Sequence, residues 1–152
     1  MADVPPHEAI RNLLGRYCEL IDAGDLDGLG EMFARAVIRN EGGEELGRGP
    51  AAAARVYAGV KLYPDGTPRT RHLTTNSVIE VNEAAGTATA RSAYVVFQAT
   101  DALALQPIIA GSYRDRFARD EDGGWYFTER TFGVSLVGKL GEHLAFPVTP
   151  AD

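Results

Sequence analysis

The order of the periodic segments constrains this fold most, because helical patterns come first in the chain and long strand patterns follow. Apolar residues recur at intervals of three and four over residues 10–21, which is typical of one face of an amphipathic helix. Gly24 ends this segment, and Asp25 is placed to cap a second helix that runs to Phe33. Residues 51–61 are rich in alanine and predict a third helix. The helices are therefore expected to lie N-terminal to most of the sheet.

Beta-branched and aromatic residues dominate the rest of the chain, in runs that are typical of strands. The expected strands lie at residues 37–40, 73–81, 87–99, 108–119 and 125–137. A loop is expected at residues 100–106, and the sequence leaves open whether it acts as a lid. Because helices precede a meander of strands, the pattern predicts an α+β fold with an antiparallel sheet. Strands this long curl, so the helices are expected to cover one face of the sheet and to enclose a cavity for a small molecule.

Length, charge and cysteine content narrow the classes of protein to which this chain can belong. The 152 residues suit one domain, 1–152, with a core at about 8–137 and an extended or partly ordered tail at 138–152. The net charge is -6 and no long basic run occurs, so nucleic acid is not an expected partner. No apolar stretch is long enough to span a membrane, and the N-terminus does not resemble a signal peptide. With one cysteine, Cys18, the sequence predicts a cytoplasmic protein without an internal disulfide.

Four segments carry a resemblance to a known family, namely residues 17–27, 71–76, 111–117 and 124–130. Their order and spacing resemble the SnoaL-like family of the nuclear-transport-factor-2-like superfamily. The resemblance is to the branch that holds scytalone dehydratase, dehydrochlorinase and bile-acid dehydratase, and it covers roughly residues 8–137. It implies a cone-shaped α+β barrel, in which N-terminal helices pack on a strongly curved, mostly antiparallel sheet. The superfamily also contains isomerases, cyclases and non-enzymes, so the fold alone does not define a reaction.

Asp22 and His72 are the expected catalytic pair. The resemblance implies that an Asp of the first helix holds a His of the first long strand, which then removes a proton from the substrate. Physical chemistry supports this pair independently of the resemblance. A neutral His is the best-placed general base near pH 7, and a carboxylate on its other nitrogen fixes the tautomer. Asp22 also lies at the C-terminal end of a helix, where a carboxylate is electrostatically unfavourable. The alternative is that Asp22 is a solvated turn residue and His72 a core or rim histidine.

Five further residues are expected to bind the substrate. Tyr17 lies on the apolar helix face, where its ring either packs in the core or presents its hydroxyl to a substrate oxygen. Arg130 lies in an otherwise apolar strand, where pairing with a carboxylate on a neighbouring strand would account for it. The resemblance to the dehydrochlorinase branch implies the alternative, an Arg that lines the pocket and neutralises developing negative charge. Tyr94, Tyr113 and Asn76 are weaker candidates, since strand alternation and bulges decide which way they point.

These residues favour a lyase or isomerase that needs no cofactor and acts on a small apolar or cyclic molecule. A rival enzyme hypothesis is a ketosteroid-isomerase-like proton shuttle centred on Glu41 and Tyr17, although Glu41 lies among glycines typical of an exposed turn. A second rival is a non-catalytic ligand-binding or assembly module. No metal site is expected, because His7 and His143 lie near the ends and do not cluster with other ligands. Self-association as a homodimer or homotrimer is expected, to cover the outer face of the sheet.

Overall fold

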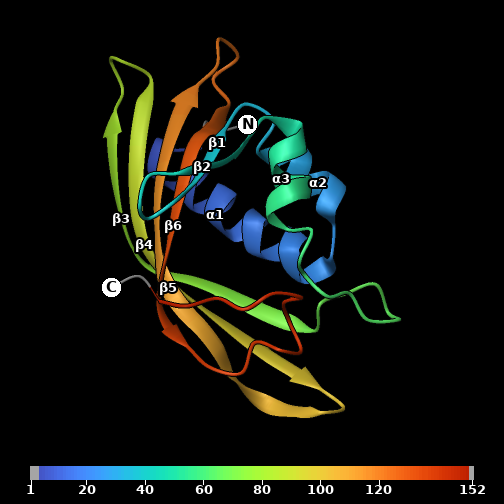
Figure 1. Ribbon diagram of the computed structural model, residues 1–152. Helices are drawn as coiled ribbons and strands as arrows, with labels where there is room; N and C mark the ends of the chain where they lie inside the picture. Colours follow the sequence, from blue (N-terminus) through green and yellow to red (C-terminus); the bar gives the residue numbers. More distant parts are fainter. Residues whose placement is uncertain (1–3, 151–152) are drawn as a thin grey trace.

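The computed structural model describes residues 4–150, in which three helices lie on the concave side of one six-stranded sheet (Figure 1). The helices are α1 (Pro6–Ala23), α2 (Leu26–Met32) and α3 (Pro50–Val56). The strands are β1 (Val37–Asn40), β2 (Glu45–Arg48), β3 (Thr70–Asn82), β4 (Thr87–Thr100), β5 (Leu103–Arg119) and β6 (Trp125–Val137). The α+β class predicted from the sequence is therefore confirmed. The ends of the expected domain, residues 1–3 and 151–152, lie outside the described residues.

The sheet is curled but not closed, with the strand order β2-β1-β6-β5-β4-β3. Its neighbouring strands are antiparallel except for β1, which runs parallel to β6. Irregular register steps between Thr75 and Val78 in β3, and between Ala110 and Gly111 in β5, mark places where the strands bend. The long strands thus wrap partly around the helices and form the expected cone.

Helix α1 supplies most of the cover for the sheet, because Ile10, Leu14, Tyr17 and Ile21 are buried along one face. The helix ends at Gly24, whose φ of 71° is left-handed and whose N–H donates a hydrogen bond to the carbonyl oxygen of Ile21. Asp22 consequently sits on the last turn of α1, directly before the reversal into α2.

Three segments differ from the sequence-based expectation. Residues 45–48 form the edge strand β2 by pairing with β1, although no strand was expected there. Helix α3 ends at Val56 and is shorter than the predicted segment 51–61. Thr100 pairs directly with Leu103, so the long loop expected at residues 100–106 is instead a tight turn at the start of β5. That turn is too short to act as a lid.

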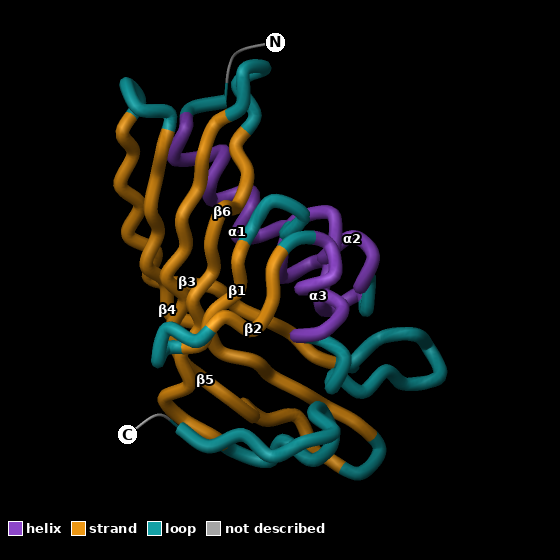
Figure 2. Tube along the Cα trace, turned by 45° about the horizontal axis from the view of Figure 1, so that its top comes forward, coloured by secondary structure: helices purple, strands orange, loops and turns teal. Residues whose placement is uncertain are grey.

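The chain after β6 folds back across the open end of the cone, where Figure 2 shows it as a loop below β5. We call residues 139–148 the C-terminal segment. The N–H of Lys61 donates to the carbonyl oxygen of His143, and the N–H of Ala145 donates to that of Gly59. The C-terminal segment is therefore attached to the loop that follows α3 and covers the open end of the cone. No helix within residues 4–150 combines the length and apolar character that crossing a membrane requires.

Candidate functional site

A cavity of about 150 Å³ lies between the helices, the concave face of the sheet and the C-terminal segment. Most of its wall is formed by aliphatic and phenylalanine side chains. The polar and aromatic-polar side chains that line it are Tyr17, Tyr57, His72, Tyr94, Tyr113, Arg130 and His143. A cavity of this volume is about the size that holds one benzene ring. The site is therefore a small apolar chamber with a few polar groups on its wall, as ligand sites commonly are.

Asp22 and His72 meet at the wall of this cavity. Oδ1 of Asp22 lies 2.6 Å from Nδ1 of His72, and Oδ2 accepts a hydrogen bond from the backbone N–H of His72 at 2.8 Å. The hydroxyl of Thr70 donates a third hydrogen bond to Oδ1 at 2.8 Å. The two side chains are only 7% (His72) and 6% (Asp22) exposed. Because an ionised carboxylate can only accept, Nδ1 carries a proton, and in the neutral form of the ring the lone pair lies on Nε2.

The charge on Asp22 is stabilised by its partners. Burial by itself would raise the pKa of this carboxyl, but the hydrogen bonds and charge of His72, together with the hydroxyl of Thr70, lower the pKa below its usual value. Asp22 is therefore an anion at neutral pH. An anion on Nδ1 stabilises the imidazolium that would form if Nε2 accepted a proton.

Arg130 is buried at the wall of the same cavity and is held by Asp115 on the neighbouring strand. Nε and Nη2 of Arg130 donate to the two carboxylate oxygens of Asp115, each at 2.8 Å. The guanidinium lies 4.2 Å from the ring centroid of Tyr17 and 4.0 Å from that of Tyr113. Its third nitrogen, Nη1, is buried and has no hydrogen-bond partner among the described residues. The ion pair expected with a carboxylate on a neighbouring strand is therefore present, and Arg130 also lines the cavity.

The tyrosine hydroxyls of the cavity are neutral donors. Burial raises the pKa of Tyr17, Tyr57 and Tyr113 well above the usual value. The hydroxyl of Tyr57 donates to that of Tyr17 at 3.3 Å. Burial, with the negative charge of Glu41, raises the pKa of Tyr94 to about 12, and this hydroxyl donates to a backbone carbonyl at 3.0 Å. Tyr94 therefore presents mainly its ring to the cavity.

Two of the residues proposed from the sequence lie elsewhere. Asn76 is exposed and does not line the cavity, because the bulge in β3 gives it a φ of 52° and turns it away. The structure therefore does not support its assignment as a substrate-binding residue. Glu41 is also exposed and absent from the cavity lining, as its glycine-rich surroundings indicated.

Two residues of the site were missed by the sequence analysis, His143 and Tyr57. His143 is 5% exposed, and its ring centroid lies 6.2 Å from that of His72. The signal for its burial was the row of apolar residues around it, Leu140, Leu144, Phe146 and Val148. Tyr57 was missed because it follows an alanine-rich run that was interpreted only as a helix. Within residues 4–150, no group of three or more His, Cys, Asp or Glu side chains is arranged to hold a metal ion.

A curled sheet with helices on its concave face and an apolar cavity between the two layers defines the cone-shaped, nuclear-transport-factor-2-like class of α+β proteins. Within this class the chain belongs to the SnoaL-like family, because the family model of the SnoaL-like domain matches residues 3–131. No curated protein matches the chain.

Solved structures show the same fold. A nuclear-transport-factor-2-like protein with a cystatin-like fold from Novosphingobium aromaticivorans is 27% identical, with 84% of this chain and 80% of that chain covered and a TM-score of 0.67. A variant of Rv3472, a protein of unknown function from Mycobacterium tuberculosis, is 29% identical, with 90% and 79% covered and a TM-score of 0.65. A third protein, from N. aromaticivorans and provisionally named a scytalone dehydratase, is 18% identical, with 96% and 91% covered and a TM-score of 0.68.

Proposed function

We propose that this protein is a cofactor-independent lyase or isomerase that removes a proton from a carbon atom of a small, apolar or cyclic substrate. The observation that carries the proposal is the buried carboxylate of Asp22 on Nδ1 of His72, because it leaves Nε2 as a base at the wall of an apolar cavity. His72 is the general base, and Asp22 orients it.

The other polar groups of the cavity suit the charge that proton removal creates. When Nε2 of His72 takes a proton from a carbon beside a carbonyl group, the electron pair of the C–H bond moves toward the carbonyl oxygen. Tyr17 and Arg130 line the same cavity and supply neutral and charged hydrogen-bond donors for that oxygen. An elimination then expels a leaving group such as hydroxide, which takes up the proton as water. An isomerisation returns the proton to a different carbon.

The geometry favours this reaction over the two rivals. A shuttle centred on Glu41 requires its carboxylate in the cavity, whereas Glu41 is exposed and outside the lining. A binding module needs no oriented base, and it gives no reason for a buried carboxylate to accept three hydrogen bonds from His72 and Thr70.

The test uses cyclohexanone in D₂O and follows deuterium incorporation beside the carbonyl group by mass spectrometry. The wild-type protein should catalyse the exchange, and Asp22→Asn should lower the rate by about 10²–10⁴-fold, since the ring loses its tautomer and its counter-ion. His72→Gln should lower it at least as much. A parallel assay with 3-hydroxycyclohexanone, in which loss of water gives a conjugated enone, separates elimination from proton exchange alone.

Matched controls separate the hypotheses. Asp27→Asn changes an exposed aspartate in α2 and should leave the exchange unchanged. Loss of exchange in Glu41→Gln with retention in Asp22→Asn would replace the proposal by the Glu41 shuttle. Tight binding of both cyclic ketones by wild-type protein that exchanges no deuterium would instead indicate a binding module.

We also propose that residues 1–152 form one domain and that the domain self-associates through the outer face of its sheet. Leu73, Val95, Ala110 and Leu136 lie directly opposite one another on adjacent strands from β3 to β6. Their neighbours Tyr94 and Val96 line the cavity, so Val95 points outward. Leu73 is 44% and Leu136 69% exposed, which leaves an apolar row for a second copy to cover.

A further inference from the structure

The C-terminal segment carries a second imidazole into the cavity. His143 is 5% exposed, lines the cavity, and lies edge-on to His72 with the ring centroids 6.2 Å apart. It also lies beyond residues 3–131, the part of the chain that matches the SnoaL-like domain. His143 therefore lies outside the part of the chain that the family model describes.

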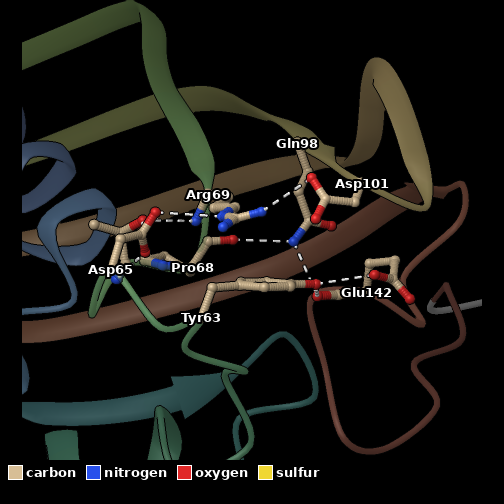
Figure 3. A network of polar contacts seen from close by, with 8 residues as sticks. Tyr63, Asp65, Pro68, Arg69, Gln98, Asp101 and Glu142 are labelled. Carbon is tan, nitrogen blue, oxygen red and sulfur yellow. Dashed lines mark hydrogen bonds and ion pairs between the residues drawn. The ribbon is translucent and has the colours of Figure 1, made fainter.

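The backbone around His143 is fixed by a set of polar contacts at the open end of the cone (Figure 3). The carbonyl oxygen of Glu142 accepts hydrogen bonds from the hydroxyl of Tyr63 at 2.7 Å and from Nε2 of Gln98 at 3.0 Å. The carboxylate of Glu142 accepts from the hydroxyls of Tyr63 at 3.0 Å and Thr100 at 3.2 Å. The main chain next to His143 is thus held by contacts that do not involve the imidazole ring.

The imidazole ring of His143 lacks a hydrogen-bond partner at its buried Nδ1 within residues 4–150. This lack is unfavourable for a buried polar group. Burial, together with the positive charge that His72 carries when protonated, lowers the pKa of His143 to about 4, although Asp22 opposes this. At neutral pH the ring is therefore uncharged, with one N–H donor and one acceptor nitrogen.

We propose that His143 is a substrate-binding residue, whose neutral ring forms a hydrogen bond with the hydroxyl or carbonyl oxygen of a single-ring substrate held against His72. This inference rests on the proposed function, because it assigns the two imidazoles to one ligand. A neutral imidazole can serve as such a donor without carrying a charge into an apolar chamber. The substrate class is a monocyclic molecule with one oxygen function, in agreement with a cavity of about 150 Å³.

The test compares phenol with toluene, two probes of nearly equal shape that differ in the hydroxyl group. Dissociation constants are measured by NMR titration of the full chain. Wild-type protein should bind phenol roughly 3- to 10-fold more tightly than toluene, the range expected for one hydrogen bond. In His143→Leu the two affinities should become nearly equal, while His143→Gln should retain part of the preference. His7→Leu, which changes an exposed histidine of α1, should behave like wild type.

Folding of the variant is checked by its melting temperature. His143→Leu should melt no lower than wild type, because the substitution removes an unpartnered buried polar group. A phenol preference that persists in His143→Leu would overturn the inference. Failure of the wild-type protein to bind either probe would also overturn it, and so would a clear loss of stability in the variant. Deuterium exchange with an unchanged phenol preference in His143→Leu would remove this inference alone. Loss of that preference without deuterium exchange by wild type would remove the proposed function alone.

Discussion

Arg130 reaches from β6 into the interior with its side chain only 1% exposed, and its guanidinium lies against the rings of Tyr17 and Tyr113. A buried cation is tolerable there because Asp115 lies directly opposite on β5 and accepts two hydrogen bonds from it. Asp115 therefore holds the donor Nη1 at the cavity as well as neutralising the charge. At the scale of single residues, the same contact serves the fold and the site.

Asp115→Asn should be strongly destabilising, because it leaves a buried guanidinium without its counter-ion. The expected loss in the free energy of unfolding is about 3–5 kcal/mol, measured by urea denaturation. The double variant Asp115→Leu/Arg130→Met removes both charges and should recover much of that loss. Equal destabilisation of the single and double variants would show that the ion pair is not the cause.

The depressed pKa of His143 makes stability fall in mild acid. The unfolded chain binds a proton on this ring near pH 6.5, whereas the folded protein binds it near pH 4, so lowering the pH between these values favours the unfolded state. His143 should therefore account for a loss of roughly 2 kcal/mol between pH 7 and pH 5. Urea denaturation at both pH values should show a smaller loss in His143→Leu, since His72 and Asp22, the titratable groups that face the ring, are unchanged. Equal losses in the two proteins would contradict this assignment.

The site was predictable from the sequence only where local pattern and family resemblance agreed. Asp22 and His72 were proposed as a pair, and the structure places them in hydrogen-bond contact. Asn76 was misplaced because a bulge changes the direction of side chains in a strand, and a pattern of alternation cannot reveal it. His143 was missed because its approach to His72 depends on the folding back of the C-terminal segment, which is a long-range event.

At the scale of elements, the end of α1 determines the position of Asp22. Gly24 has a left-handed φ of 71°, and a Cβ atom at this position would lie 2.2 Å from the carbonyl oxygen of Gly66. The helix end therefore packs against the loop that precedes β3, the strand of Thr70 and His72. Close approach of these two backbones lets the carboxylate reach both residues.

Gly24→Ala should destabilise the protein and weaken the pair at the same time. The left-handed conformation costs an alanine about 1–2 kcal/mol, and the contact with Gly66 adds to this because backbone atoms must move. Thermal unfolding measures the first effect, and the rate of deuterium exchange by the folded variant measures the second. Gly15→Ala is the control, because an added Cβ there meets nothing and alanine favours a helix. A Gly24→Ala protein with wild-type stability would contradict the assignment.

Most of the strands were predictable, whereas strand β2 and the start of β5 depended on tertiary contacts. The predicted strands at residues 37–40 and 125–137 match β1 and β6 in full, because their beta-branched and aromatic runs are bounded by turn residues. Strand β2 was not predicted, since a four-residue edge strand among glycines is defined by its pairing with β1. Strand β5 begins earlier than expected because β4 continues to pair with it up to the turn.

At the scale of the whole molecule, the outer face of the sheet carries the apolar row of Leu73, Val95, Ala110 and Leu136. Leu136→Lys places a charge in this row and should convert the expected dimer or trimer into a monomer, as measured by light scattering during gel filtration. Because Leu136 is 69% exposed, the substitution should leave the circular dichroism spectrum unchanged. Wild-type protein that elutes as a monomer would contradict the proposal.

The C-terminal segment has a consequence for how such proteins diverge. It is attached largely through main-chain groups, such as the carbonyl of His143 and the N–H of Ala145, yet it contributes His143, Leu144, Phe146 and Val148 to the cavity wall. Main-chain hydrogen bonds place few demands on side-chain identity, so we expect conservative changes at these positions to leave Asp22 and His72 in place. During evolution, a few changes in this short segment would then alter which substrate is accepted without altering the reaction. Substrate specificity could thus change while the catalytic residues are retained.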